Sequence, residues 1–414
     1  MKTTLLSTYD ISGGAARAAY RLHQGLQEVG VDSTMLVQNR NSDDRSVIGP
    51  RSKAEKMITF LSHDIDRLPL ALYRKRSPNI YTLNWFPGQK ANTILRQNPD
   101  IVNLHWIGGG FSNLGNLRKL KRPIVWTMHD MWAFTGGCHY TEGCDRYLKN
   151  CGKCPQLGSH KNADLSRWNW NRKHRILQEL DLTIVTPSQW LANCSRSSSI
   201  LGHMRTEVIP HGIDLKTYQP HDRNFVRKAL KLPINKPLIL FGASSAMKDK
   251  RKGIYLLEET LQRLETFEFK EQPEVLILGA SYGDLNCPFP VHYLGTLQDD
   301  ISLSLAYSCA DVFVAPSLED NLPNTVVEAI ACGVPCVAFR IGGMPDLIGH
   351  GYSGYLASPF DVEDFAQGIY WALTAAEPLG RRSRQIAEER YGLVRQAQAY
   401  RSLFEELLEN KLVK

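Results

Sequence analysis

Short runs of aliphatic and β-branched residues alternate with longer amphipathic stretches along the whole chain. The runs predict strands, and the stretches between them are long enough for helices that connect parallel strands. In the first half we expect a helix over residues 15–29 and strands over residues 3–8, 32–38, 100–106, 122–128, 182–188 and 206–212. In the second half we expect strands over residues 238–244, 274–280, 291–296, 311–317, 335–339 and 354–357. This order predicts an α/β protein with two parallel, doubly wound sheets.

The length of the chain, 414 residues, also favours two domains with separate cores. A polar stretch with a proline, residues 213–225, comes before the first strand of the second half. We therefore expect two Rossmann-like domains, 1–214 and 215–390, that face each other across a cleft. Residues 391–414 are expected to form a C-terminal helix that could cross back to the first domain, with its apolar residues at helical spacing: Leu403, Phe404, Leu407 and Leu408.

The net charge of +7 is unevenly distributed. Residues 1–210 hold 28 Lys and Arg against 16 Asp and Glu, while the remainder holds 21 against 26. A basic first half favours an anionic partner such as a lipid or membrane phosphate. Its basic stretches lack the interleaved aromatic residues of RNA-binding proteins, so we do not expect a nucleic-acid partner.

One segment of the first half, residues 51–77, is apolar in its middle and cationic at both ends. It could lie on an anionic membrane leaflet, or it could be an ordinary amphipathic helix packed on the first domain. Asp64 and Asp66 argue against deep insertion. The start of the chain is too short in apolar residues for a signal peptide, and no run of about 18 apolar residues follows. We expect a cytoplasmic protein, with peripheral membrane contact as an open alternative.

A candidate ligand site follows the strand predicted at 311–317, where an acidic loop leads into a helix at Pro323. The amides of Asn321, Leu322, Asn324 and Thr325 are expected to be unpaired, and together with the helix dipole they suit a phosphate. Asp320 and Glu328 flank this position and could bind hydroxyl groups of a sugar or a ribose. The alternative is an acid that caps the helix and a solvated helical glutamate.

Two further loops follow predicted strands. After residue 242 comes a cationic cluster that includes Lys248, Arg251 and Lys252, which could neutralise an anionic leaving group or could simply be a solvated loop. Between the first strand and the first helix stand Gly13 and Gly14, where backbone without side chains can approach a ligand closely.

Taken together, these pieces resemble a known family, the family 4 (group 1) retaining glycosyltransferases of the GT-B fold. The resemblance is carried, in the order of the family's motifs, by residues 12–30, 127–132, 185–192, 208–214, 240–253, 292–297, 310–348 and 351–357. Enzymes of this family move a sugar from a nucleotide-sugar donor to an acceptor. The fold that the resemblance implies is the same two-domain α/β fold that the strand pattern predicts.

The resemblance also implies roles for individual residues. Lys252 matches the lysine on the donor diphosphate, and Glu328 matches the second acid of the E-x7-E motif, which contacts the ribose. Asp320 stands where the family has the first glutamate, which touches the transferred sugar, although the neighbouring Glu319 could compete for that role. His129 matches the first-domain histidine that reaches over the sugar.

One departure from the family concerns its arginine, which normally follows the strand glycine. Small residues stand there, around Gly242 and Ala243, and Arg251 or Lys248 could supply the charge. The family transfers with retention of anomeric configuration, and the departing phosphate is thought to take the acceptor's proton. Preorganised amides and cations can stabilise the developing charge without a metal.

The resemblance therefore implies a UDP- or GDP-sugar donor and a saccharide or lipid-linked acceptor, in the synthesis of cell-surface polysaccharide or glycolipid. Two alternatives share the fold. A nucleotide-sugar epimerase would use the same donor site without an acceptor, and a non-catalytic protein would bind the nucleotide sugar without turning it over.

Four of the nine cysteines lie within seventeen residues, Cys138, Cys144, Cys151 and Cys154, and the family does not explain them. The last two form a C-x-x-C pair, and glycines nearby permit tight turns. Four thiolates in a reducing compartment suit a structural zinc ion, and four protein ligands would leave no open position for catalysis. Disulfides and unligated thiols are the alternatives.

Overall fold

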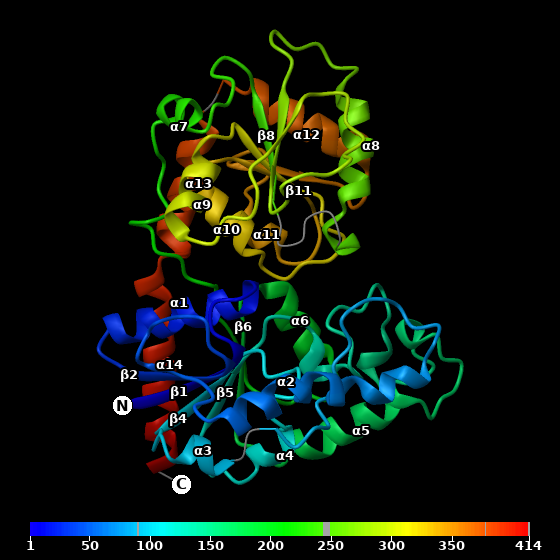
Figure 1. Cartoon of the computed structure of the whole chain (residues 1–414), viewed down its shortest axis with the longest axis vertical. Helices are drawn as coiled ribbons and strands as arrows, with labels where there is room; N and C mark the ends of the chain where they lie inside the picture. The colour runs from blue at the N-terminus through cyan, green and yellow to red at the C-terminus, as the bar shows by residue number, and fades with distance from the viewer. Residues whose placement is uncertain (89–90, 243–248, 377, 413–414) are drawn as a thin grey trace. The chain divides into compact units, whose positions relative to one another are not determined.

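The computed structural model describes residues 1–88, 91–242, 249–376 and 378–412. The chain folds as two compact units (Figure 1), one formed by Met1–Pro210 with Gln396–Lys414 and the other by His211–Arg395. Each unit contains one sheet whose neighbouring strands are all parallel. The predicted α/β fold class with two parallel sheets is therefore confirmed.

The sheet of the first unit has the strand order β3-β2-β1-β4-β5-β6-β7. Its strands are β1 (Lys2–Tyr9), β2 (Asp32–Asn39), β3 (Val47–Ile48), β4 (Ile101–Leu104), β5 (Ile124–Thr127), β6 (Leu182–Thr186) and β7 (Thr206–Val208). Apart from the two-residue β3, each coincides with a predicted strand. Leu5 and Leu6 in β1 are both fully buried but belong to different core clusters, so apolar side chains fill both faces of the sheet.

Apart from the C-terminal α14, the helices of the first unit lie between these strands in the chain. They are α1 (Gly14–Glu28), α2 (Lys53–Arg67), α3 (Ala91–Leu95), α4 (Leu114–Leu117), α5 (Leu165–Leu177), α6 (Gln189–Ser197) and α14 (Leu393–Leu412), with 3-10 turns η1 (Leu68–Leu72), η2 (Trp132–Phe134), η3 (Arg146–Leu148) and η4 (Pro155–Leu157). Helix α14 packs on the first unit, where the hydroxyl groups of Tyr400 and Thr127 lie 2.8 Å apart and Phe404 is fully buried.

The sheet of the second unit has the order β10-β9-β8-β11-β12-β13. Its strands are β8 (Leu238–Gly242), β9 (Glu274–Leu278), β10 (Val291–Tyr293), β11 (Val312–Ala315), β12 (Cys336–Phe339) and β13 (Gly354–Ala357). Its helices are α7 (Arg223–Ala229), η5 (Lys250–Lys252), α8 (Ile254–Leu264), α9 (Asp300–Ser308), α10 (Asn324–Ala331), α11 (Met344–Leu347), α12 (Val362–Thr374) and α13 (Leu379–Arg390).

In both sheets the strand order reverses direction at one place, between β1 and β4 in the first unit and between β8 and β11 in the second. In open parallel sheets of this kind, ligands bind beyond the carboxyl ends of the two strands that flank such a reversal. The loops after β1, β8 and β11 hold Gly13, Arg251, Lys252 and residues 319–322, which the sequence marks as candidates.

Candidate functional site

The loops that follow β8 and β11 meet in the second unit. The amide of Leu318 donates to the carbonyl oxygen of Arg251 at 2.8 Å, which ties the two loops together. The Lys252 ammonium lies 2.6 Å from Oδ2 of Asp320, and Nη1 of Arg251 lies 3.4 Å from the same oxygen. Three of the predicted site residues therefore form one cluster at the reversal point of the sheet.

Two glycines allow the backbone to close around this cluster. Gly253 has φ +72°, and a Cβ atom there would lie 1.9 Å from the carbonyl oxygen of Pro316. Gly342, in the loop after β12, has φ +52°, and a Cβ atom there would lie 1.9 Å from the carbonyl oxygen of Asp320. Any larger residue at either position would force the loop that carries Asp320 to move.

The charges in this cluster are partly balanced. Asp320 is 6% exposed. Burial raises the pKa of its carboxyl, but Lys252, and after it Arg251, outweigh burial and hold that pKa below its ordinary value. Arg251 also donates to the carbonyl oxygen of Glu319 at 2.9 Å and to Asp249 at 3.1 Å. Ala243 and Lys248, the other positions relevant to the family arginine, lie outside the described residues.

Glu328 lies in the first two turns of α10 and is nearly fully buried. Its Oε2 accepts a hydrogen bond of 2.9 Å from the hydroxyl of Tyr307 on α9. Burial, and after it the charge of Glu328, hold the pKa of Tyr307 well above its ordinary value, so this hydroxyl remains a donor. Glu328 is thus buried and held in place by Tyr307, and the alternative of a solvated helical glutamate is wrong.

The start of α10 differs from the prediction in one respect. The helix begins at Asn324 with Pro323 at its cap position. The amide of Asn321 donates to Oδ1 of Asp320 at 3.1 Å, so the expectation that this amide is unpaired is wrong. Leu322 is buried in the core of the second unit, which anchors the loop and leaves only its backbone for a ligand.

In the first unit, the predicted candidates lie at the carboxyl edge of the sheet. Gly13 (φ +92°) and Gly14 follow β1, both are exposed, and a Cβ atom at Gly13 would meet nothing within 4 Å. His129 follows β5, and its Nε2 lies 3.0 Å from Nδ1 of His105, which follows β4. Burial lowers the pKa of His129 to about 4, against the opposing effect of Asp130, so its ring is neutral near pH 7.

A hydrogen-bonded network supports the turn that carries His129. Nδ1 of His139 lies 2.7 Å from Oδ2 of Asp130, and Nε2 of His139 lies 2.8 Å from the hydroxyl of Thr82. Sequence reasoning missed His105, Asp130 and His139, although the position of His105 at the end of a predicted strand was a usable signal. His129 lies in the first unit and Lys252 in the second, and their joint action on a donor stays a prediction.

Two protein-family descriptions match the chain. Glycosyltransferase Family 4 matches residues 12–217, and Glycosyl transferases group 1 matches residues 236–375. The chain belongs to the group 1, family 4 glycosyltransferases. This confirms the resemblance on which the roles of His129, Lys252, Asp320 and Glu328 were predicted.

The chain is similar in sequence to glycosyltransferases of other organisms. The chain is 26% identical over 345 residues to the putative colanic acid biosynthesis glycosyl transferase WcaC of Escherichia coli, covering 79% of this chain and 80% of that protein. It is 28% identical over 239 residues to the sulfoquinovosyl transferase SQD2 of Arabidopsis thaliana, covering 53% of this chain but only 44% of that protein.

Solved glycosyltransferase structures share the fold over almost the whole chain. Sucrose-phosphate synthase from Thermosynechococcus elongatus superposes with a TM-score of 0.70 at 18% identity, with 99% of each chain covered. Anabaena HepE in complex with UDP-glucose superposes with a TM-score of 0.62 at 16% identity, covering 98% of this chain and 100% of that one. At these identities the likeness shows the GT-B fold alone.

The surface of α2 in this glycosyltransferase is unusual. Its apolar side chains point outward: Phe60 is 77% exposed, and Met57, Ile58 and Leu61 are also exposed. Two polar residues of α2, Ser62 and Asp66, are buried instead. The segment packs on the first unit through Ser62, Asp66 and Leu70 and leaves most apolar residues of α2 exposed, so peripheral membrane contact stays a prediction. No helix among the described residues is long and apolar enough to cross a bilayer.

Asp66 does not oppose membrane contact in the way its charge suggests. Its carboxylate accepts hydrogen bonds from the amides of Asn84, Trp85 and Phe86 at 2.9 to 3.1 Å. It therefore faces the protein, away from the exposed apolar side of the helix. Asp64, by contrast, is exposed.

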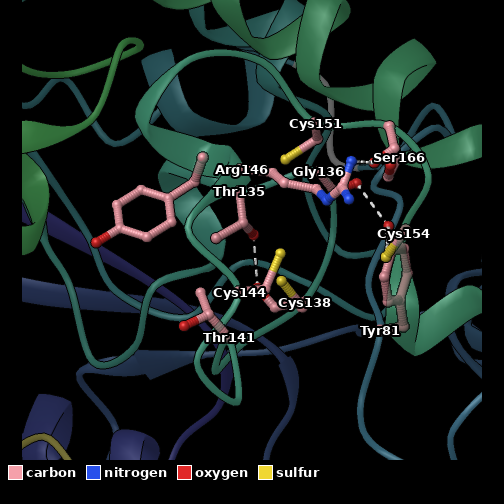
Figure 2. A pocket seen from close by; sticks show the side chains of 12 residues that line it. Tyr81, Thr135, Gly136, Cys138, Thr141, Cys144, Arg146, Cys151, Cys154 and Ser166 are labelled. Carbon is pink, nitrogen blue, oxygen red and sulfur yellow. Dashed lines mark hydrogen bonds between the residues drawn. The ribbon is translucent and has the colours of Figure 1, made fainter. Parts of the chain in front are cut away.

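The four clustered cysteines line one small cavity in the first unit (Figure 2). None of the nine cysteines, all of which lie in the described ranges, is joined to another in a disulfide in this structure. Among the described residues, no three His, Cys, Asp or Glu side chains are arranged around a common point as metal ligands. The zinc ion predicted from the spacing of these cysteines stays a prediction.

Proposed function

We propose that this glycosyltransferase is a retaining enzyme that transfers a sugar from a UDP- or GDP-sugar to a saccharide or lipid-linked acceptor, in the synthesis of a cell-surface polysaccharide or glycolipid. The observation that carries the donor assignment is the cluster of Arg251, Lys252 and Asp320 at the reversal point of the second sheet. Two cations at the carboxyl ends of parallel strands suit the diphosphate of such a donor.

The names of relatives support the substrate class. WcaC is named for colanic acid biosynthesis, SQD2 for sulfoquinovosyl transfer, and HepE has been solved with UDP-glucose. Two of these names concern a polysaccharide and a sulfosugar, and the third concerns a nucleotide-sugar donor. All three fit an enzyme that transfers a sugar from a nucleotide-sugar donor.

The chemistry that we propose depends on stabilising the leaving diphosphate. Lys252 and Arg251 would share their charge between Asp320 and the diphosphate, and their contacts would strengthen as negative charge grows on the leaving oxygen. Because these two cations supply positive charge in place, we propose that transfer needs no catalytic metal. On the face of the sugar ring from which it leaves, the departing phosphate would take the proton of the acceptor hydroxyl.

The remaining candidates would position the donor. Glu328, held by Tyr307, would accept hydrogen bonds from the ribose hydroxyls, and Asp320 would accept one from the transferred sugar. His129, with its neutral ring, would contact the sugar from the first unit, where Gly13 and Gly14 leave room for close approach.

We propose further that α2 and η1 hold the enzyme on an anionic bilayer, on the cytoplasmic face of a membrane where a lipid-linked acceptor resides. Phe60 and Leu72 are 77% and 84% exposed, and the cations beside them are exposed as well: Arg51, Lys53, Lys56, Arg67, Arg74 and Lys75. Each basic residue near an anionic surface contributes about 1 kcal/mol of attraction. Apolar side chains between such cations are typical of a helix that lies in the membrane interface.

The transfer reaction is tested by incubating the purified chain with UDP-, GDP- and ADP-sugars and measuring nucleotide release with and without membrane extracts as acceptor source. We expect release from one UDP- or GDP-sugar that rises when acceptor is present. Release of a free epimeric sugar without acceptor would show an epimerase. Binding of a nucleotide sugar without any turnover would show a non-catalytic protein.

Membrane contact is tested by sedimentation with vesicles. We expect binding to vesicles of phosphatidylcholine and phosphatidylglycerol in equal amounts, and little binding to phosphatidylcholine alone. Phe60→Ser should weaken binding, while Ile301→Ser, which changes another well-exposed apolar residue, on α9, should not. Equal binding by both variants and wild type would contradict the role of α2.

A further inference from the structure

The four clustered cysteines surround a cavity that fits a single atom-sized ligand. The cavity has a volume of about 20 Å³, which is room for about one water-sized sphere. Cys138, Cys144, Cys151 and Cys154 all line it, together with the ring of Tyr81. Figure 2 shows Cys151 and Cys154 on different sides of the cavity, with Cys138 and Cys144 on a third. A single ion fits into such a space.

The segment around this cavity has little regular structure of its own. Between Cys138 and Leu157 the only helical elements are the two 3-10 turns η3 and η4. The chain turns back through left-handed residues next to the cysteines: Glu142 (φ +50°) and Gly143 (φ +80°) precede Cys144, and Lys153 (φ +46°) precedes Cys154. Few helix or sheet hydrogen bonds hold this segment, so a bound metal ion would add a cross-link that fixes its conformation.

A buried lysine lies beside the cavity. Lys173 on α5 is fully buried, donates to the carbonyl oxygens of Trp132 and Thr135, and lies near Cys138 and Cys151. A buried ammonium needs a nearby negative charge to offset the cost of its burial. Four thiolates around a divalent cation carry a net charge of −2 and would supply it.

We propose that this segment binds one zinc ion through four thiolates, those of Cys138, Cys144, Cys151 and Cys154. Sulfur ligands favour zinc among the common divalent ions, and four of them close the tetrahedral shell. Because no three of these side chains share a common point in this structure, the thiols would have to turn about χ1 toward the cavity that they line, and each would give up its proton to solvent on binding.

The ion would stabilise the turn that carries His129. Cys138 precedes His139, which pairs with Asp130 next to His129, and the amide of Met131 donates to the carbonyl oxygen of His139 at 2.9 Å. The carbonyl oxygen of Cys138 accepts a hydrogen bond of 2.6 Å from Thr135. The binding free energy of a structural zinc ion is folding free energy for the segment that holds it.

The test measures metal in the untagged chain purified under reducing conditions without chelator. We expect about one zinc per chain by mass spectrometry, and none in Cys151→Ser. Cys194→Ser, which changes a half-buried cysteine of the same unit outside the cavity, should keep its zinc. Iron in place of zinc would overturn the choice of ion, and equal zinc in both variants would overturn the ligand set.

A second measurement on the wild-type chain covers the case in which Cys151→Ser does not fold. Replacing the metal with cobalt(II) should give the intense visible absorption of a tetrahedral cobalt site and thiolate-to-cobalt charge transfer in the near ultraviolet. A metal-free chain without these bands, whose four thiols are joined in disulfides or all react with a thiol reagent in the folded state, would overturn the proposal. Neither readout depends on sugar transfer.

Discussion

Lys252 and Asp320 form an ion pair in which the ammonium nitrogen lies 2.6 Å from a buried carboxylate oxygen. The pair joins the loop after β8 to the loop after β11, and Arg251 reaches the same oxygen at 3.4 Å. Asp320 thus holds the two cations in place before any donor arrives. An incoming diphosphate would compete with Asp320 for the same positive charge, and this competition gives the first prediction.

Asp320→Asn should separate donor binding from transfer. Removing the carboxylate charge frees Lys252 and Arg251 for the diphosphate, so the affinity for UDP or GDP should rise about threefold. Sugar transfer should fall by about tenfold or more because the contact to the transferred sugar loses its charge. Calorimetric titration and transfer rates measure the two effects. A fall in both would show that Asp320 serves the fold of the site and not the sugar.

Glu328→Gln should weaken nucleotide binding about tenfold, or about 1.4 kcal/mol, with a smaller effect on the rate at saturating donor. The proposed ribose contact is the same in the ground and transition states, so its loss acts on affinity. Tyr307→Phe, which removes the hydroxyl that holds Glu328, should act in the same direction. The exposed Glu265→Gln serves as control. Unchanged nucleotide affinity in Glu328→Gln would contradict the ribose assignment.

His129→Ala should abolish transfer while nucleotide binding and the thermal unfolding curve stay near those of wild type. The reason is that His129 lies in the first unit, whereas the proposed nucleotide contacts lie in the second. His160→Ala, at an exposed position in the same unit, is the matched control. Transfer at the wild-type rate in His129→Ala would remove this histidine from the site.

The first unit should lose stability as the pH falls from about 6.5 to about 4, in part through His23 on α1. His23 is fully buried between the hydroxyls of Ser33 and Ser46, each 2.8 Å away, and burial lowers its pKa to about 4, against the opposing effect of Asp44. The unfolded chain takes up this proton first, near pH 6.5, so the contribution is complete above that pH and lost below it, up to about 3 kcal/mol.

Urea unfolding midpoints between pH 7.5 and 4.5 measure this effect. His23→Gln, which removes the titrating ring, should show a flatter pH dependence than wild type. His203→Gln, at an exposed position, should keep the wild-type slope. Equal slopes for wild type and His23→Gln would show that other groups account for the loss.

Much of the fold could be predicted because most strands are short runs of aliphatic and β-branched residues between turn residues. The exception, β3, is two residues long and has no such run. The orientation of α2 could not be predicted. Its helical period is clear, but Asp66 is drawn inward by amides of residues 84–86, which are distant in sequence. Tertiary hydrogen bonds decided which face of this helix is exposed.

In the candidate site, too, part could be predicted from the sequence and part depends on tertiary contacts. The sequence marks Lys252, Asp320 and Glu328 by their motifs, but their partners come from other elements. Tyr307 on α9 reaches Glu328 only because α9 and α10 pack together, and His105 meets His129 because β4 and β5 are neighbours. Strand adjacency and helix packing are tertiary facts, and no local pattern in the sequence encodes them.

The central claim is that the cations after β8 stabilise the leaving diphosphate, and the turnover of Lys252→Ala tests it most directly. With the donor identified by the panel of nucleotide sugars, the account predicts that this substitution lowers turnover at least about a hundredfold, or about 3 kcal/mol, since the lost contact strengthens as the bond breaks. Lys250→Ala, an exposed neighbour in the same 3-10 turn, should turn over at nearly the wild-type rate. Near-normal turnover by a folded Lys252→Ala variant would contradict the account.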